Sequence, residues 1–259
     1  MWTFEHFLAI VPAFVVMVVI AILLRKFLIN KPLHIRMIPF QICTVILLVI
    51  EVFKQIDSID INGEGYSLYS IPLHVCSLFL FLFPLMSFYK GKHSDVINTF
   101  ACTVSGAMTL FILILPTMLY PVNDILTWNT NYLSFHTVFF HNLVFFMFIL
   151  IVALELHTPQ KKHYLKEIII GSLCYCAVAI TFSYLLKTNF SNFYSCNMPG
   201  INDVVATIKS ATSDTFGQMF YVFVLTLLHV GFFILSYYVY KLISYGITKL
   251  TNKKTNYIE

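Results

Sequence analysis

Residues 5–24 read EHFLAIVPAFVVMVVIAILL, and Arg25 and Lys26 follow this apolar run directly. A helix needs about 20 apolar residues to cross the hydrocarbon core of a bilayer. The run is too long for the apolar part of a signal peptide, and Glu5 and His6 stand where such a peptide carries a basic cluster. The stretch therefore predicts a retained transmembrane helix.

The rest of the chain has the same character. Of its 259 residues, 59% are hydrophobic and only 11% are charged, whereas soluble domains carry about 45–50% apolar and about 25% charged residues. A surface so poor in charge excludes a water-soluble fold. The formal net charge of +4 does not indicate nucleic-acid binding, because the basic residues lie beside apolar spans, where they set orientation.

Seven stretches are long and apolar enough to span a membrane. They lie at residues 5–24, 37–53, 68–88, 96–115, 134–155, 167–186 and 216–240. The sequence therefore predicts an all-α, polytopic membrane bundle of about seven transmembrane helices. We expect a single transmembrane domain over residues 1–245 and a short basic cytoplasmic tail over residues 246–259.

The basic residues are shared unevenly between the connections. One alternating set of connections, together with the tail, holds 13 of the 16 Lys and Arg residues. Because basic residues favour the cytoplasmic side, the N-terminus is predicted to lie outside the cell membrane and the C-terminus in the cytoplasm. The long outer loop at 187–215 contains Met198-Pro199-Gly200 and a short predicted helix at 201–209. Loops of this length act as lids or caps, or rest on the headgroups.

Ionisable residues inside membrane spans usually face a cavity or a partner, so each one is a candidate for function. Glu51, His74 and His141 fall in the outer halves of predicted spans, and His229 falls near the middle of one. They predict one polar cavity that opens to the outer face. The alternative is that each histidine only forms a hydrogen bond to a neighbouring helix.

Helical spacing adds hydroxyl groups to this set. Ser70, His74 and Ser77 follow an i, i+4, i+7 pattern, which predicts one shared helix face. A histidine beside a hydroxyl is the minimum for an activated nucleophile when a third group orients the base. Glu51 is the candidate for that third group, or for an acid.

The fifth predicted span offers two histidines. Thr137 and His141 are four residues apart and are predicted to face the same way. His136 and His141 are about 140° apart around a helix, so both cannot point into one narrow site. His141 is the preferred candidate because it lies deeper, whereas His136 can reach the headgroups.

A metal site is a weaker alternative. Neutral imidazoles suit zinc and copper, but no H-x-x-x-H or H-E-x-x-H spacing occurs within a span. We therefore expect neither a metal nor another cofactor.

The run Ile71-Pro72-Leu73-His74-Val75-Cys76-Ser77 resembles the Pro-Leu-His-Leu-Cys-Ser element of the YwaF-like family of bacterial membrane proteins, which have seven predicted helices. His141 is similar to that family's second conserved histidine. The segment Lys187-Thr188-Asn189-Phe190 and the helix after it resemble the family's C-terminal third. That family is distantly similar to a eukaryotic membrane family that includes an ether-phospholipid acyltransferase.

The resemblance implies a multi-pass membrane protein that acts on lipid acyl groups, as an acyltransferase or an ester hydrolase, from an outer-facing polar cavity. In the acyltransferase a cysteine precedes the histidine, whereas Leu73 precedes His74 here. A nucleophile would then be Ser77 or Thr137. The candidate catalytic residues are His74, His141, Glu51, Ser77 and Thr137.

The expected partners are membrane lipids. The alternative function is a small-solute or proton-coupled transporter, or a membrane binding protein.

Overall fold

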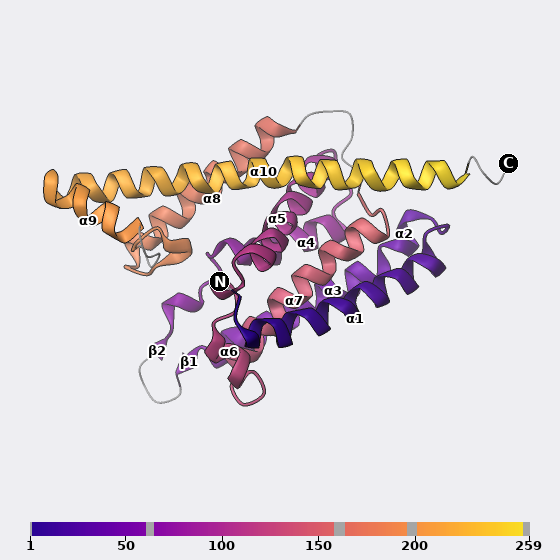
Figure 1. The fold of residues 1–259 in the computed structure, drawn as a ribbon, viewed down its shortest axis with the longest axis horizontal. Coiled ribbons are helices and arrows are strands. Elements are labelled where there is room, and N and C mark those ends of the chain that lie inside the picture. Colours follow the sequence, from indigo (N-terminus) through magenta and orange to yellow (C-terminus); the bar gives the residue numbers. More distant parts are fainter. Residues whose placement is uncertain (1, 61–64, 158–163, 196–200, 256–259) are drawn as a thin grey trace.

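The computed structural model describes residues 2–60, 65–157, 164–195 and 201–255, and Figure 1 shows its helices gathered into one elongated bundle. The α-helices are α1 (Phe4–Leu28), α2 (Leu33–Arg36), α3 (Ile38–Asp57), α4 (Phe79–Phe88), α5 (Ser94–Ile114), α6 (Val122–Thr127), α7 (Tyr132–Ala153), α8 (Leu165–Leu185), α9 (Ile201–Ala211) and α10 (Asp214–Thr255). Short 3-10 helices are η1 (Leu68–Ser70), η2 (Val75–Leu78), η3 (Pro116–Met118) and η4 (Phe190–Asn192). Strands β1 (Ile59–Asp60) and β2 (Gly65–Tyr66) pair antiparallel.

Six segments of the described chain form helices that are long and apolar enough to cross a membrane. They are α1, α2 with α3, α5, α7, α8 and the Asp214–Gly246 part of α10. The prediction of an all-α membrane bundle is confirmed, and each of these helices covers one predicted span. Helix α9 confirms the short helix predicted at residues 201–209, whereas Met198-Pro199-Gly200 lies outside the described residues.

The remaining predicted span, residues 68–88, is not one continuous helix. Ile71 is extended, with φ −57° and ψ 132°, because the ring of Pro72 disfavours the helical conformation in the residue before it. His74 is extended as well, with φ −71° and ψ 156°. An apolar helix then runs from η2 through α4 over residues 75–88. This element is shorter than the other six.

This break overturns the predicted helix face shared by Ser70, His74 and Ser77. Ser70 lies in η1, and its hydroxyl accepts a hydrogen bond from Ser58 at 2.7 Å. Ser77 lies in η2, where its backbone N–H donates to the His74 carbonyl at 2.9 Å. An i, i+4, i+7 spacing predicts a shared face only on a continuous helix, and Pro72 interrupts the helix here.

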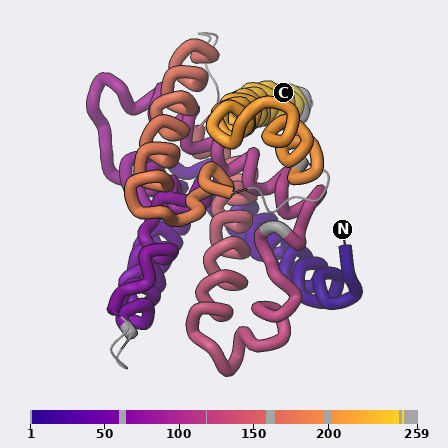
Figure 2. Tube along the Cα trace, turned by 90° about the vertical axis from the view of Figure 1, so that its left-hand side faces the viewer, coloured from indigo at the N-terminus to yellow at the C-terminus, as the bar shows by residue number. Residues whose placement is uncertain are grey.

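Helices α5 and α7 form the centre of the bundle. Helix α5 packs against α4, α7 and α10, and α7 packs also against α1 and α3. The buried face of α5 includes the small residues Ala101, Ser105 and Ala107, which let neighbouring helices approach closely. Helix α8 contacts α10 but crosses it at a steep angle, as Figures 1 and 2 show. Helix α1 exposes most of its apolar side chains, as a helix in contact with lipid does.

Both α1 and α7 begin at one end of the bundle, called here the N-terminal end, and both finish at the opposite end. At the opposite end two guanidinium groups cap the last turn of α7. Arg25 donates to the Ala153 carbonyl and forms an ion pair with Glu155 at 2.8 Å. Arg36 donates to the Leu154 carbonyl at 2.8 Å. Cations at a helix C-terminus satisfy its free carbonyl groups and interact favourably with the helix dipole.

We expect Arg36→Ala to lower the free energy of unfolding by about 1–3 kcal/mol, because the carbonyls at the end of α7 lose their donor. Thermal unfolding in detergent micelles measures the effect. Lys26→Ala, which changes an exposed cation near the same end, is the control and should leave the unfolding temperature unchanged. Equal unfolding temperatures for the two variants would contradict this function of Arg36.

His157, just beyond α7, joins three elements at the same end. Its Nε2 lies 2.9 Å from the Thr99 hydroxyl of α5, and its carbonyl accepts from the Tyr240 hydroxyl of α10 at 2.7 Å. Asp95 lies 3.8 Å from its Nδ1 and accepts a hydrogen bond from Tyr164. Burial lowers the pKa of His157, against the opposing effect of Asp95. Hydrogen bonding to Asp95 raises the pKa of Tyr164 to about 12.

The lowered pKa of His157 makes stability depend on pH. The unfolded chain binds a proton at His157 more readily than the folded chain does, so this contribution is fully present above pH 6.5 and is lost as the pH falls toward the folded pKa. We expect the unfolding temperature to drop between pH 7.5 and pH 5. His157→Gln should reduce that drop, whereas His93→Gln should leave it unchanged. An identical pH dependence in the wild type and His157→Gln would refute the assignment.

Candidate functional site

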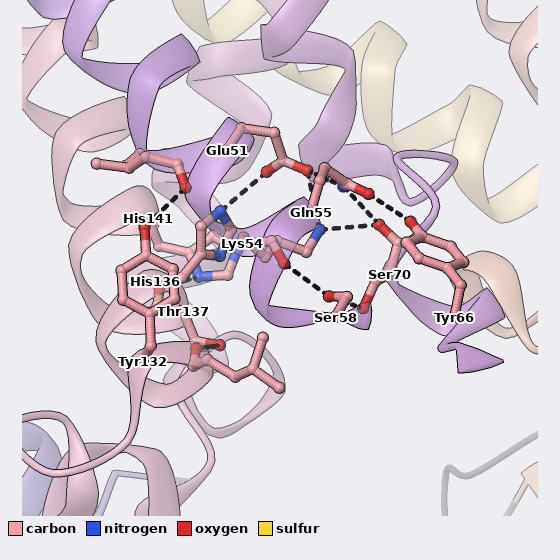
Figure 3. Close-up of polar contacts among 12 residues, drawn as sticks. Glu51, Lys54, Gln55, Ser58, Tyr66, Ser70, Tyr132, His136, Thr137 and His141 are labelled. Carbon is pink, nitrogen blue, oxygen red and sulfur yellow. Dashed lines mark hydrogen bonds and ion pairs between the residues drawn. The ribbon is translucent and has the colours of Figure 1, made fainter. Parts of the chain in front are cut away.

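A buried carboxylate of α3 lies at the centre of a hydrogen-bond network near the N-terminal end. Glu51 Oε1 accepts from Lys54 Nζ at 3.0 Å and from Gln55 Nε2 at 2.5 Å. Glu51 Oε2 accepts from Nε2 of His136 on α7 at 2.9 Å. Figure 3 shows these side chains converging between the two helices. Three donors around one buried carboxylate favour its charged form and satisfy its acceptor capacity.

The same network fixes the broken segment before α4. Lys54 and Gln55 both donate to the Ser70 carbonyl, at 3.0 Å and 2.9 Å. Tyr66 of β2 donates to the side-chain carbonyl of Gln55. The non-helical backbone around Ser70 thereby has partners for its polar groups, which backbone at membrane depth requires. Lys54 is itself largely buried, so its charge is held by Glu51 rather than by water.

The two histidines of α7 are both buried but have different partners. His136, which was expected to reach the headgroups, is buried and contacts Glu51. His141, the preferred candidate, is buried too, but it does not contact the carboxylate in the described structure. Because only oxygen acceptors face the His136 Nε2, that nitrogen carries a proton in the neutral ring. Glu51 therefore orients His136, not His141.

His141 has an unusual environment of its own. Its Nδ1 lies 2.8 Å from the Thr137 carbonyl of the same helix. A carbonyl only accepts hydrogen bonds, so Nδ1 is the protonated nitrogen and Nε2 carries the free lone pair in the neutral ring. Nε2 is buried and has no hydrogen-bond partner among the described residues. A buried polar atom without a partner is rare in proteins. The lone pair is therefore available to a ligand or a water molecule.

His74 has the complementary arrangement. Its Nδ1 accepts from the backbone N–H of Ser191 at 3.4 Å, so the proton of the neutral ring is on Nε2. That Nε2 is also buried without a hydrogen-bond partner in the described structure. The rings of Tyr69 and Phe190 pack against the imidazole, with centroid distances of 4.5 Å and 5.5 Å. His74 thus offers a donor where His141 offers an acceptor.

The other predicted residues are held in separate contacts. The Thr137 hydroxyl donates to the Leu133 carbonyl of its own helix at 3.0 Å. Ser77 is buried in η2, where its backbone N–H donates to the His74 carbonyl. His229 lies on α10, where its Nδ1 is 2.9 Å from the Leu225 carbonyl. No contact in the described structure joins these three to the Glu51 network.

The buried groups nevertheless lie near one another. His141 is close enough to His136, His74 and Lys54 for their charges to act on it. This set, which we call the histidine cluster, joins α3, α7 and the segment before η2. Within the described ranges, no group of three His, Cys, Asp or Glu side chains is arranged to hold a metal ion. The cluster offers proton donors and acceptors.

An apolar groove lies beside the cluster, between α1, α6 and α7, with a volume of about 320 Å³. Its lining residues are Leu8, Ala9, Ile125, Trp128, Phe135, Val138, Phe139 and Asn142. Asn142 directly follows His141. Both α1 and α7 are long and apolar enough to span a membrane.

The sequence analysis did not identify Lys54 and Gln55. A usable signal was present, because Glu51, Lys54 and Gln55 follow an i, i+3, i+4 pattern on one helix. His136 was considered but set aside, and a single sequence does not reveal its contact with Glu51, since that partner comes from another helix.

Fold and site together define a multi-pass helical membrane protein with a buried cluster of histidines and a carboxylate close to one end of the bundle. A comparison with family models matches residues 1–246 to the TMEM164 family. The chain belongs to the TMEM164 family. This match does not bear on the resemblance to the YwaF-like proteins or on the more distant likeness to the acyltransferase. No curated protein and no solved structure matches the chain.

We expect Glu51→Ala to lower the free energy of unfolding by about 3–5 kcal/mol, since it leaves the buried Lys54 without its counter-charge. Asp57→Asn, at an exposed position of the same helix, is the matched control and should have little effect. Chemical unfolding in mixed micelles, followed by circular dichroism, measures both. A Glu51→Ala protein as stable as the control would show that the network does not hold α3 to α7.

Proposed function

We propose that this membrane protein acts on ester-linked acyl groups of lipids, as an acyltransferase or an ester hydrolase. The observation that supports the proposal best is the buried, unpartnered lone pair on His141 Nε2. An imidazole held in one tautomer by a carbonyl, with its other nitrogen free, has the arrangement of a general base.

His74 supports the same reaction as a hydrogen-bond donor. Its free Nε2–H and the free Nε2 lone pair of His141 are complementary. A hydroxyl group between them would donate to His141 and accept from His74. The ligand that suits this pair is therefore an alcohol or a water molecule.

The proposed step uses this hydroxyl as the nucleophile. His141 Nε2 takes its proton as the oxygen attacks the ester carbonyl carbon, and the carbonyl electron pair moves to its oxygen. Collapse of the tetrahedral intermediate expels the lipid alkoxide, which takes the proton back from His141. Water as the nucleophile gives hydrolysis, and the hydroxyl of a second lipid gives acyl transfer. The step needs neither Ser77 nor Thr137 as a nucleophile.

Glu51 and His136 are positioning residues in this mechanism. The three donors around Glu51 leave it unsuited to act as an acid or a nucleophile. Its bond to His136 holds α7 against α3, and its partners Lys54 and Gln55 hold the segment that leads to His74. The position of His141 relative to His74 thus depends on this network.

The surroundings favour a lipid over a soluble substrate. The groove between α1, α6 and α7 is apolar, and its lining includes Asn142, which follows His141 in the sequence. The uneven distribution of Lys and Arg supports an N-terminal end that faces the outside of the cell membrane. In that orientation the substrate is a lipid of the outer leaflet.

The test uses the purified full chain in nanodiscs that contain a phospholipid with a labelled acyl chain and a lysophospholipid acceptor. Mass spectrometry measures free fatty acid and newly acylated acceptor. We expect His141→Gln to reduce the rate about 100-fold or more, as loss of a general base does. His74→Gln should also reduce it, whereas the control His229→Gln should stay within about twofold of the wild type.

Two results would overturn the proposal. One is no product above that of empty nanodiscs, and the other is a His141→Gln variant as active as the wild type. Uptake of a small solute into proteoliposomes without any acyl product would favour the transporter instead.

A further inference from the structure

Tyr120 lies in the connection between α5 and α6 and is held firmly by its backbone. Its N–H donates to the Pro116 carbonyl at 2.8 Å. Its carbonyl accepts from Nε2 of His6, on the first turn of α1, at 2.8 Å. The Thr3 hydroxyl lies 2.7 Å from the other ring nitrogen of His6. The side chain of Tyr120 is fully buried.

The phenol hydroxyl at the end of this side chain has no hydrogen-bond partner in the part of the chain that the structure describes. Buried tyrosine hydroxyls usually find a partner. Burial also raises the pKa of Tyr120, so the hydroxyl keeps its proton and acts as a donor. A buried donor without an acceptor is a position at which a ligand oxygen gains a hydrogen bond.

The Tyr120 hydroxyl belongs to a ring that contacts His141. The ring of Tyr120 packs edge-on against the ring of His141, with a centroid distance of 5.6 Å and an interplanar angle of 75°. His141 Nε2 also lacks a partner in the described structure. The phenol O–H and the imidazole lone pair are therefore two unused polar groups, one a donor and one an acceptor, on adjacent rings.

We propose that the Tyr120 hydroxyl binds the carbonyl oxygen of the acyl ester and stabilises the oxyanion that forms there. The inference rests on the proposed function and adds a catalytic residue to it. When the nucleophile attacks and His141 takes its proton, the carbonyl electron pair moves onto the oxygen. Tyr120 donates its hydrogen bond to that negative charge and keeps its proton. The pair returns to re-form the carbonyl as the alkoxide leaves.

Tyr120→Phe is the informative variant, because it removes one hydroxyl and leaves the ring in place. We expect it to lower kcat about 10²–10³-fold, as loss of one oxyanion donor does, with little change in KM. The unfolding temperature should stay the same or rise, since the hydroxyl makes no hydrogen bond within the described protein.

Tyr240→Phe is the matched control. It removes a buried tyrosine hydroxyl at the opposite end of the bundle, where that hydroxyl donates to the His157 carbonyl. We expect it to lower the unfolding temperature and to leave kcat unchanged. The two variants should thus show opposite effects on stability and on turnover.

The outcomes separate the two proposals. A fully active Tyr120→Phe protein, in a preparation in which His141→Gln is inactive, overturns the function of Tyr120 and leaves the acyl chemistry standing. A Tyr120→Phe protein that loses stability and activity together overturns it as well, because the hydroxyl is then structural. A wild type without acyl activity overturns both.

Discussion

The hydrogen bond between Glu51 and His136 is the contact on which the rest of the site depends. A carboxylate among apolar helices is stable only when donors surround it, and here they come from its own helix and from α7. The same donors reach the Ser70 carbonyl, so the irregular segment before α4 is tied to α3. One buried charge thereby fixes the relative positions of α3, α7 and the segment before α4, the last two of which carry histidines.

The membrane helices were predictable because each is a long apolar run, and such a run has few other stable conformations in a bilayer. The exception was the segment from 68 to 88, where apolar composition suggested a span but Pro72 excludes a continuous helix. The conformational effect of Pro72 can be predicted from the sequence. The span was predicted from hydropathy, however, and an average over a window is not changed by one proline.

The candidate site was predictable only in part. Glu51, His74 and His141 were found because ionisable residues are rare in apolar spans, and the structure brings all three to the same end of the bundle. The contact of Glu51 with His136 was not predicted, since depth along a helix says nothing about the helix packed against it. The buried Nε2 without a partner, which distinguishes His141 from His229 in the described structure, requires coordinates.

Polar contacts hold helix α1 to the bundle at both of its ends, by His6 at Tyr120 and by Arg25 at Glu155. Between them it packs on α7, while most of its apolar side chains are exposed. A transmembrane helix adapts to a thicker or thinner bilayer by changing its tilt. Because one anchor of α1 is the backbone of Tyr120, any such tilt pulls on the residue that packs against His141. The mechanical state of the lipid is thus coupled to the geometry of the buried polar groups.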